Sequence, residues 1–260
     1  MKSILSCLSV CLVLVTGVYA GDVVTEENIT VEVSSGDPVE IFTINGDITV
    51  EEWNSDQVEV IYTITCSSEE QLEFITVDCN TSGGIICEVD YDESWGGSQN
   101  GGVDFTLKIP SNIDLEIELA SVNGNVSIDG GNGEALLEVV NGNIEAKGFS
   151  GELAVHCVNG NIDISESPGI RIAELVNGNI ECVINALEDD LELAAVNGSI
   201  TLNLGIDAEV EIETISGTIE IEDIFNAYIT DDIVGSSSEF GDGEFSIEIS
   251  TVSGDIIIDN

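Results

Sequence analysis

Val122-Asn123-Gly124-Asn125-Val126 recurs with little change as Val140-Asn141-Gly142-Asn143-Ile144, Val158-Asn159-Gly160-Asn161-Ile162 and Val176-Asn177-Gly178-Asn179-Ile180. Later copies keep the turn as Asn197-Gly198, Ser216-Gly217 and Ser253-Gly254, and an earlier one is Ile44-Asn45-Gly46-Asp47-Ile48. From Asn123 onward the steps are 18, 18, 18, 20, 19 and 37 residues. A single Asn-Gly indicates only a turn, because both residues tolerate positive φ. A series with this period is typical of stacked repeat units.

The apolar residues around each turn decide between two folds. By default, Asn-Gly between alternating runs predicts a two-residue hairpin. The fourth residue before Asn or Ser is apolar in every unit, and so is the third residue after it. Both could share one face of a hairpin. The residues before the turn are Leu119, Leu137, Val155, Ala173, Leu193, Ile212 and Ile249, and those after it are Val126, Ile144, Ile162, Ile180, Ile200, Ile219 and Ile256. The residue directly before Asn or Ser is also aliphatic every time, and a hairpin would place it on the opposite face. A corner at Asn-Gly that resets which side faces inward explains the pattern, because it would let this aliphatic residue face inward as well.

We therefore predict an all-β fold, a β-solenoid of about 18 to 20 residues per coil. Coils stack about 4.8 Å apart, so eight coils would span roughly 40 Å. A twisted meander buried on both faces is the alternative. We assign residues 114–260 to the solenoid, and residues 21–113 to a β-rich cap with the first coils, because that segment has longer alternating strands. The cap contains Trp53, Tyr62, Phe74, Tyr91 and Trp95, which we interpret as cap core or, if sugars bind, as stacking surfaces.

Residues 1–20 have the pattern of a secretory signal. Lys2 precedes an apolar run from Ile4 to Val18, and Val18-Tyr19-Ala20 is a small-residue cleavage site. No later run reaches membrane-spanning length. We therefore expect a product that is exported to the periplasm, the cell surface or the extracellular space, with no membrane insertion after signal cleavage.

The charge is extreme, with 51 Asp and Glu against 4 Lys and Arg, a formal net charge of −47. Nucleic acids and anionic membranes are polyanions that proteins hold through Lys and Arg, so both are excluded as electrostatic partners. Cations, basic proteins or surface glycans remain as partners, and the sequence does not determine the oligomeric state.

Stacked coils would align acidic residues into outward rows. Glu145, Asp163, Glu181 and, two coils on, Glu220 share one position of the repeat. Unit like charges at coil spacing repel by about 0.9 kcal/mol even at the dielectric of water, so counter-ions are needed. Either a salty habitat screens the rows, or the carboxylates hold Ca²⁺. We favour general screening, because no EF-hand spacing occurs, and we expect no required cofactor.

Five cysteines remain after the signal. Cys157 and Cys182 lie at small apolar positions of the repeat, which predicts buried thiols. Cys66, Cys79 and Cys87 lie outside the repeat, and one disulfide among them is expected without the pair being determined. His156, the only histidine, shares its row with Glu138 and Glu174, so we interpret it as an outward residue and not as a catalytic base.

Several segments resemble a known family. They are Val103-Asp104-Phe105-Thr106-Leu107-Lys108-Ile109-Pro110, Leu115-Glu116-Ile117, the Val-Asn-Gly-Asn-Ile units, Gly241-Asp242-Gly243-Glu244-Phe245-Ser246-Ile247 and Thr251-Val252-Ser253-Gly254-Asp255-Ile256. Together they resemble the exported "putative adhesin" domain-of-unknown-function family of bacteria and archaea, over most of residues 37–260. The resemblance implies a β-solenoid at the cell envelope and transfers no catalytic residue.

Our leading hypothesis is an exported, non-enzymatic, adhesin-like binding or structural module with a highly acidic surface. One alternative is a carbohydrate-active enzyme of the lyase or hydrolase type, which predicts a groove with two or three converged carboxylates of raised pKa. A second alternative is a matrix protein that assembles through its terminal coils.

Overall fold

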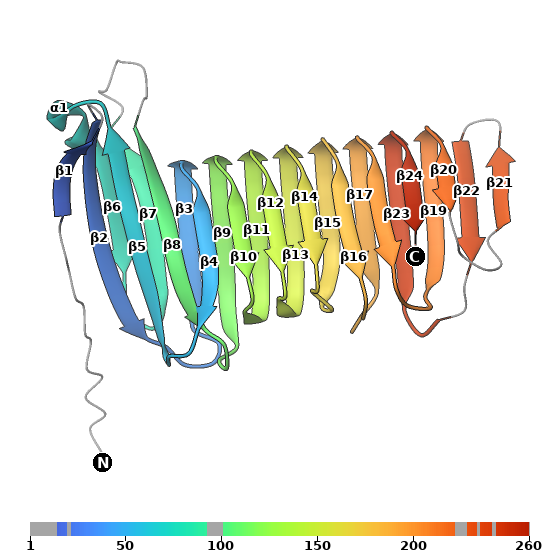
Figure 1. Ribbon diagram of the computed structural model, residues 1–260, viewed down its shortest axis with the longest axis horizontal. Coiled ribbons are helices and arrows are strands. Elements are labelled where there is room, and N and C mark those ends of the chain that lie inside the picture. The colour runs from blue at the N-terminus through green and yellow to red at the C-terminus, as the bar shows by residue number, and fades with distance from the viewer. Residues whose placement is uncertain are drawn as a thin grey trace, which may run out of the picture.

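The computed structural model describes residues 15–19, 22–92, 101–221, 228–232, 235–240 and 243–259, with side chains in 23–92, 101–221 and 243–259. The described chain is almost entirely β and forms two 12-stranded sheets that run the length of an elongated stack (Figure 1). The predicted β-solenoid is therefore confirmed.

Each sheet has a spatial order that differs from the chain order. The first sheet consists, in spatial order, of β1 (Val15–Tyr19), β2 (Asp22–Glu32), β5 (Gln57–Cys66), β8 (Gly102–Pro110), β4 (Ile48–Trp53), β10 (Val126–Asp129), β12 (Ile144–Lys147), β14 (Ile162–Ser165), β16 (Ile180–Ile184), β18 (Ile200–Leu204), β24 (Ile256–Asp259) and β20 (Ile219–Ile221). The second consists of β21 (Tyr228–Asp232), β22 (Gly235–Phe240), β19 (Glu209–Ser216), β23 (Ser246–Ser253), β17 (Leu191–Asn197), β15 (Ile170–Asn177), β13 (Ser150–Asn159), β11 (Asn132–Asn141), β9 (Leu115–Asn123), β3 (Pro38–Asn45), β7 (Ile85–Tyr91) and β6 (Ile75–Asn80). A short helix, α1 (Glu69–Leu72), lies between β5 and β6.

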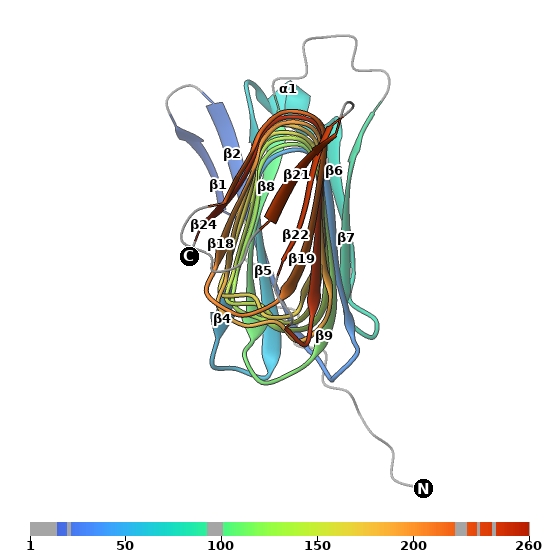
Figure 2. The same ribbon diagram turned by 90° about the vertical axis from the view of Figure 1, so that its right-hand side faces the viewer.

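A coil consists of one strand from each sheet, and successive coils pair in parallel. Viewed along the stack, the coils superimpose into a narrow flattened loop (Figure 2). Asn45 of β3 aligns with Asn123 of β9, and Ile48 of β4 aligns with Val126 of β10. The isolated early copy at residues 44–48 is therefore the first coil of the stack.

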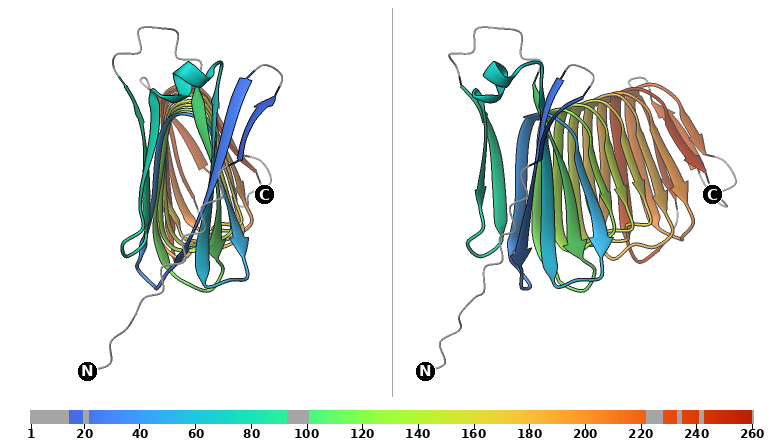
Figure 3. Two further views of the ribbon diagram at one scale, coloured as in Figure 1. Left: turned by 90° about the vertical axis from the view of Figure 1, so that its left-hand side faces the viewer. Right: turned by 60° about the vertical axis from the view of Figure 1, so that its left-hand side comes forward.

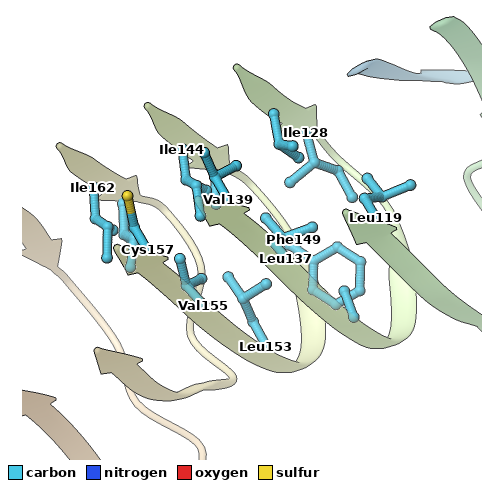
Figure 4. Close-up of a cluster of buried hydrophobic side chains, with 14 of the residues drawn as sticks. Leu119, Ile128, Leu137, Val139, Ile144, Phe149, Leu153, Val155, Cys157 and Ile162 are labelled. Atoms are coloured by element: carbon cyan, nitrogen blue, oxygen red, sulfur yellow. The ribbon is translucent and has the colours of Figure 1, made fainter. Parts of the chain in front are cut away.

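The interior contains the two apolar rows that the repeat predicted. Leu119, Leu137 and Val155 align across neighbouring coils and are fully buried, as are Ile144 and Ile162 opposite them. Figure 4 shows these side chains filling the space between the two strands of each coil. This prediction is confirmed, and like side chains pack against one another in register from coil to coil.

At the Asn-Gly corner, the inward residue is Ser121 and not the aliphatic Val122 that was expected there. Ser121 and Val126 are five positions apart and both face the interior. In a regular strand, residues an odd number of positions apart point to opposite faces. The corner therefore does reset the parity, that is, which alternate residues face inward. Val122, however, faces solvent, and so do its counterparts in the other coils. The expectation that the corner brings this aliphatic residue inside is wrong, because the parity change falls within the turn, after Val122.

The order of the last coils also differs from the expectation that each coil stacks on the preceding one. β23 and β24 lie between β17/β18 and β19/β20, so the C-terminal coil is inserted into the stack. The physical reason is that β22 pairs antiparallel with the outer edge of β19. That edge is therefore occupied, and β23 pairs with the inner one.

At the other end, longer strands cover the first coils (Figure 3). β5 pairs antiparallel with β2 and β8, and the β6–β7 hairpin extends the second sheet beyond β3. Within the predicted signal segment, Val15–Tyr19 form β1, which pairs antiparallel with β2. The rest of that segment, residues 1–14 and 20, lies outside the described residues.

Candidate functional site

The predicted turn residues form a hydrogen-bonded ladder along the corner. The Asn141 side-chain Nδ2 donates to Asn123 Oδ1 at 2.9 Å, Asn159 donates to Asn141 at 3.0 Å, and Asn177 donates to Asn159 at 2.8 Å. The same contact joins Asn123 to Asn45 at 2.9 Å and Asn197 to Asn177 at 3.1 Å. We call these six residues the first amide ladder.

A second amide ladder lies two residues further along each coil. The Asn143 backbone N–H donates to Asn125 Oδ1 at 2.9 Å, and the Asn161 N–H donates to Asn143 Oδ1 at 2.9 Å. Asp47 begins this ladder by accepting from the Asn125 N–H at 2.7 Å. Near its other end, Asp255 accepts from the backbone N–H and the hydroxyl of Thr218, and these bonds lower the pKa of its carboxyl.

Glycine occupies the corner because neighbouring coils approach closely there. A Cβ atom on Gly160 would lie 1.6 Å from the backbone oxygen of Gly142. Of the described non-glycine residues, Glu166 alone has positive φ, so the asparagines of the corner do not use the left-handed conformation. The repeat thus needs Asn for its side-chain hydrogen bonds and Gly for the close approach.

Beside the first amide ladder runs a row of exposed aliphatic side chains, which we call the aliphatic ladder. Its members range from 37% exposed at Ile44 to 54% exposed at Ile215. In spatial order they are Ile44, Val122, Val140, Val158, Val176, Val196, Val252 and Ile215. Every one of the eight coils from β3/β4 to β19/β20 contributes one of these side chains.

An open hollow of about 750 Å³ lies over the aliphatic ladder on the outer face of the second sheet, and we call it the aliphatic groove. Its other wall is the row two positions earlier in each strand, which includes Phe42, Ala120 and Ala194. In the middle of that row, His156 aligns with Glu138 and Glu174, and its Nδ1 lies 2.9 Å from Glu174 Oε2. The groove therefore has an aliphatic wall opposite a partly acidic one.

A shallower hollow of about 330 Å³ lies on the same sheet towards the other ends of the strands. It includes Glu40 and Glu118, which oppose each other on β3 and β9, and Arg171. Burial raises the pKa of the Glu118 carboxyl, and the nearby charges of Glu40 and Glu138 raise it further. This is the described position that comes nearest to the carboxylate cluster expected of a carbohydrate-active enzyme.

The predicted acidic row lies on the outer face of the first sheet. Glu145, Asp163 and Glu181 align on β12, β14 and β16. Thr201 and Ile257 then separate Glu181 from Glu220, which stands three coils away because the C-terminal coil is inserted between them; the expected spacing of two coils is wrong. Within the described ranges, no group of three or more His, Cys, Asp or Glu residues is arranged to hold a metal ion.

The cysteines and aromatic residues belong mainly to the framework. Cys79 and Cys87 form a disulfide across the β6–β7 hairpin, while Cys66 is buried with its Sγ 3.3 Å from the Ser68 carbonyl oxygen. Cys157 and Cys182 are buried thiols, and burial raises the pKa of Cys182 to about 12.

Of the cap aromatics, Tyr62 and Tyr91 are buried, and the Tyr62 ring packs 5.8 Å from that of Phe105. Trp53 is half-buried, donates from Nε1 to the Gln57 carbonyl at 2.6 Å, and has the Lys108 ammonium 5.5 Å from its ring. Trp95 lies outside the described residues. In the described part of the cap, these tyrosine and tryptophan rings therefore have framework contacts.

Sequence reasoning identified the turn residues but not the groove. The sequence signal was present, because an aliphatic residue precedes Asn or Ser in every unit. Its meaning was missed because the residue was expected inside.

The sequence matches no protein-family model and no curated protein. Among solved structures, a "putative cell adhesion protein" from Clostridium sporogenes shares 14% identity at a TM-score of 0.43, over 90% of this chain and 98% of its own. A "putative adhesin" from Bacteroides fragilis shares 12% identity at a TM-score of 0.41, over 90% and 96%. A "putative lipid binding protein" from Parabacteroides distasonis shares 14% identity at a TM-score of 0.31, over 90% and 97%. At these identities and TM-scores, the likeness assigns no function to this chain.

In the part of the chain that the structure describes, no helix is long and apolar enough to cross a membrane.

Proposed function

We propose that this chain is an exported, non-enzymatic, adhesin-like binding module of the cell envelope or extracellular space, with the aliphatic groove as its binding surface. The single observation that carries the proposal is the aliphatic ladder, which is continuous over eight coils of a strongly acidic protein. Extended exposed apolar patches are uncommon on soluble proteins and mark surfaces that bind something.

The ladder is not required merely to build the strands. Thr has the same branched shape and a comparable β-propensity, and it would replace one of the two methyl groups of each valine by a hydroxyl that water can hydrogen-bond. The outward row of the first sheet illustrates the polar solution, because it contains Ser127, Glu145, Asp163, Glu181 and Thr201 at successive coils. That row has one aliphatic member, Ile257, whereas the aliphatic ladder has one in every coil.

The framework suits a binding surface that must remain straight. Parallel pairing in register and the two amide ladders hold each coil at a fixed distance from the next. A surface that is already ordered loses little conformational entropy when a partner binds. The acidic body disfavours polyanions and so limits which partners can approach.

The test is attachment of beads coated with the mature chain to cell monolayers and to purified surface proteins and glycans under flow. A triple variant, Val140→Thr with Val158→Thr and Val176→Thr, makes the centre of the ladder polar while keeping side-chain shape. The matched control is Val183→Thr with Ile257→Thr, because both are half-buried aliphatic residues on the outer face of the first sheet.

We expect attachment to fall at least about tenfold in the triple variant, since truncation of central anchors dominates binding losses, and to persist in the control. Both variants should melt within a few degrees of the unmodified chain. Attachment that is equal in all three proteins would contradict the proposal. So would turnover of a polysaccharide that depends on Glu118, which would favour the enzymatic alternative.

A further inference from the structure

The partly acidic wall of the aliphatic groove, which we call its rim, restricts the charge of the partner that can bind there. Glu138 and Glu174 flank His156 on the wall opposite the ladder, and the whole chain carries a formal charge of −47. A second copy of the chain or an anionic lipid would bring further negative charge to this rim. Like charges placed together across an interface are strongly unfavourable, so the rim selects a partner with basic groups.

The ladder also restricts the partner's length and period. Eight coils give seven intervals, and at about 4.8 Å each they span about 34 Å. A helix with a rise of 1.5 Å per residue covers that length in about 22 residues. Its apolar seam repeats about every 5.4 Å, close to the coil spacing, whereas side chains on one face of an extended strand repeat about every 6.6 Å.

From charge, length and period together, we propose that the aliphatic groove binds an amphipathic helix with Lys or Arg along its flanks. This inference rests on the proposed function and adds the chemistry of the partner. The apolar seam of the helix lies along the aliphatic ladder from Ile44 to Ile215, and its basic side chains reach the carboxylates of Glu138 and Glu174. Helix-in-groove recognition combines an apolar seam with charged flanks in this way.

The experiment measures fluorescence anisotropy of labelled 22-residue peptides with the mature chain. The probe is an amphipathic Leu/Lys helix. The comparison peptides are a scrambled Leu/Lys peptide of equal composition, an oligolysine of equal length and an amphipathic Leu/Glu helix.

We expect the amphipathic Leu/Lys helix to bind at least about tenfold more tightly than the other three, and to gain helical circular dichroism on binding. The triple Val→Thr variant should weaken it about tenfold or more. Glu138→Gln with Glu174→Gln should also weaken it and should reduce its salt dependence, because two rim charges are removed. The Val183→Thr with Ile257→Thr control should leave binding unchanged.

Several results would overturn the inference. Equal binding of oligolysine would mean that charge alone suffices, and equal binding of the Leu/Glu helix would mean that the rim has no influence. Ladder-dependent binding to zwitterionic vesicles, or ladder-dependent dimers in sedimentation, without peptide binding would assign the groove to a membrane or to a second copy. If bead attachment still requires the ladder while no peptide binds, the proposed function stands and the helical partner is wrong.

Discussion

Two neighbouring asparagines, Asn159 and Asn161, allow a matched test of the amide ladders. In the first ladder, Asn159 donates from Nδ2 to Asn141 at 3.0 Å and accepts from Asn177 at 2.8 Å. In the second ladder, Asn161 accepts from the Asn179 backbone N–H at 3.0 Å, and its own Nδ2 makes a longer contact of 3.3 Å to Asn143. Asn159 must therefore donate and accept, whereas Asn161 chiefly accepts.

Replacing each with Asp keeps the shape and removes the donor. Asn159→Asp loses one hydrogen bond worth about 1 kcal/mol and turns a carboxylate oxygen towards Asn141 Oδ1, so we expect a loss of about 1–2 kcal/mol in the free energy of unfolding. For a domain of this size that lowers the melting temperature by about 2–8 °C. Asn161→Asp keeps its acceptor, now charge-assisted, and should change stability by less than about 0.5 kcal/mol.

The two variants add the same charge two residues apart, so repulsion by the acidic surface is nearly equal in both. Asp47 and Asp255 already occupy the second ladder, which supports the tolerance expected at position 161. Urea unfolding followed by circular dichroism at neutral pH measures both, and acidification should reduce the deficit of Asn159→Asp because a protonated carboxyl donates again. Equal destabilisation of the two variants, or none at position 159, would refute the ladder argument.

Three further predictions concern packing and charge. Gly160→Ala places a Cβ 1.6 Å from the Gly142 oxygen and should cost at least about 3 kcal/mol in urea unfolding, whereas Gly148→Ala, whose nearest neighbour is 3.8 Å away, should cost only the roughly 1 kcal/mol of its positive φ. The raised pKa of Glu118 means that its ionised form opposes folding above that pKa. Glu118→Gln should therefore be more stable than the unmodified chain by about a few tenths of a kcal/mol at neutral pH, and the difference should vanish as pH falls through the carboxyl range. Finally, the melting temperature should rise with NaCl up to molar concentrations, because the acidic rows need general screening; a saturable rise at sub-millimolar CaCl₂ would contradict this and assign specific sites.

The repeat predicted the architecture because its physical cause is local and periodic. Apolar residues at fixed distances from Asn-Gly require an interior that recurs every coil, and Leu137 and Ile144 lie there as expected. The inserted C-terminal coil could not be predicted in the same way. Its position depends on which edge of β19 is free after β22 has paired, and that is a property of the assembled sheet.

The position of Val158 was predicted wrongly for a related reason. The sequence indicates that parity changes near Asn159-Gly160, but the residue at which it changes depends on how the turn is held. The strand keeps its alternation through Val158 and changes parity only at Asn159, whose side chain hydrogen-bonds to Asn141. At these coils the asparagine that joins one coil to the next thus directly follows the exposed aliphatic residue of the groove. Loss of the first amide ladder should therefore weaken ligand binding as well as the stack, which connects the stability of the corner to the function of the groove.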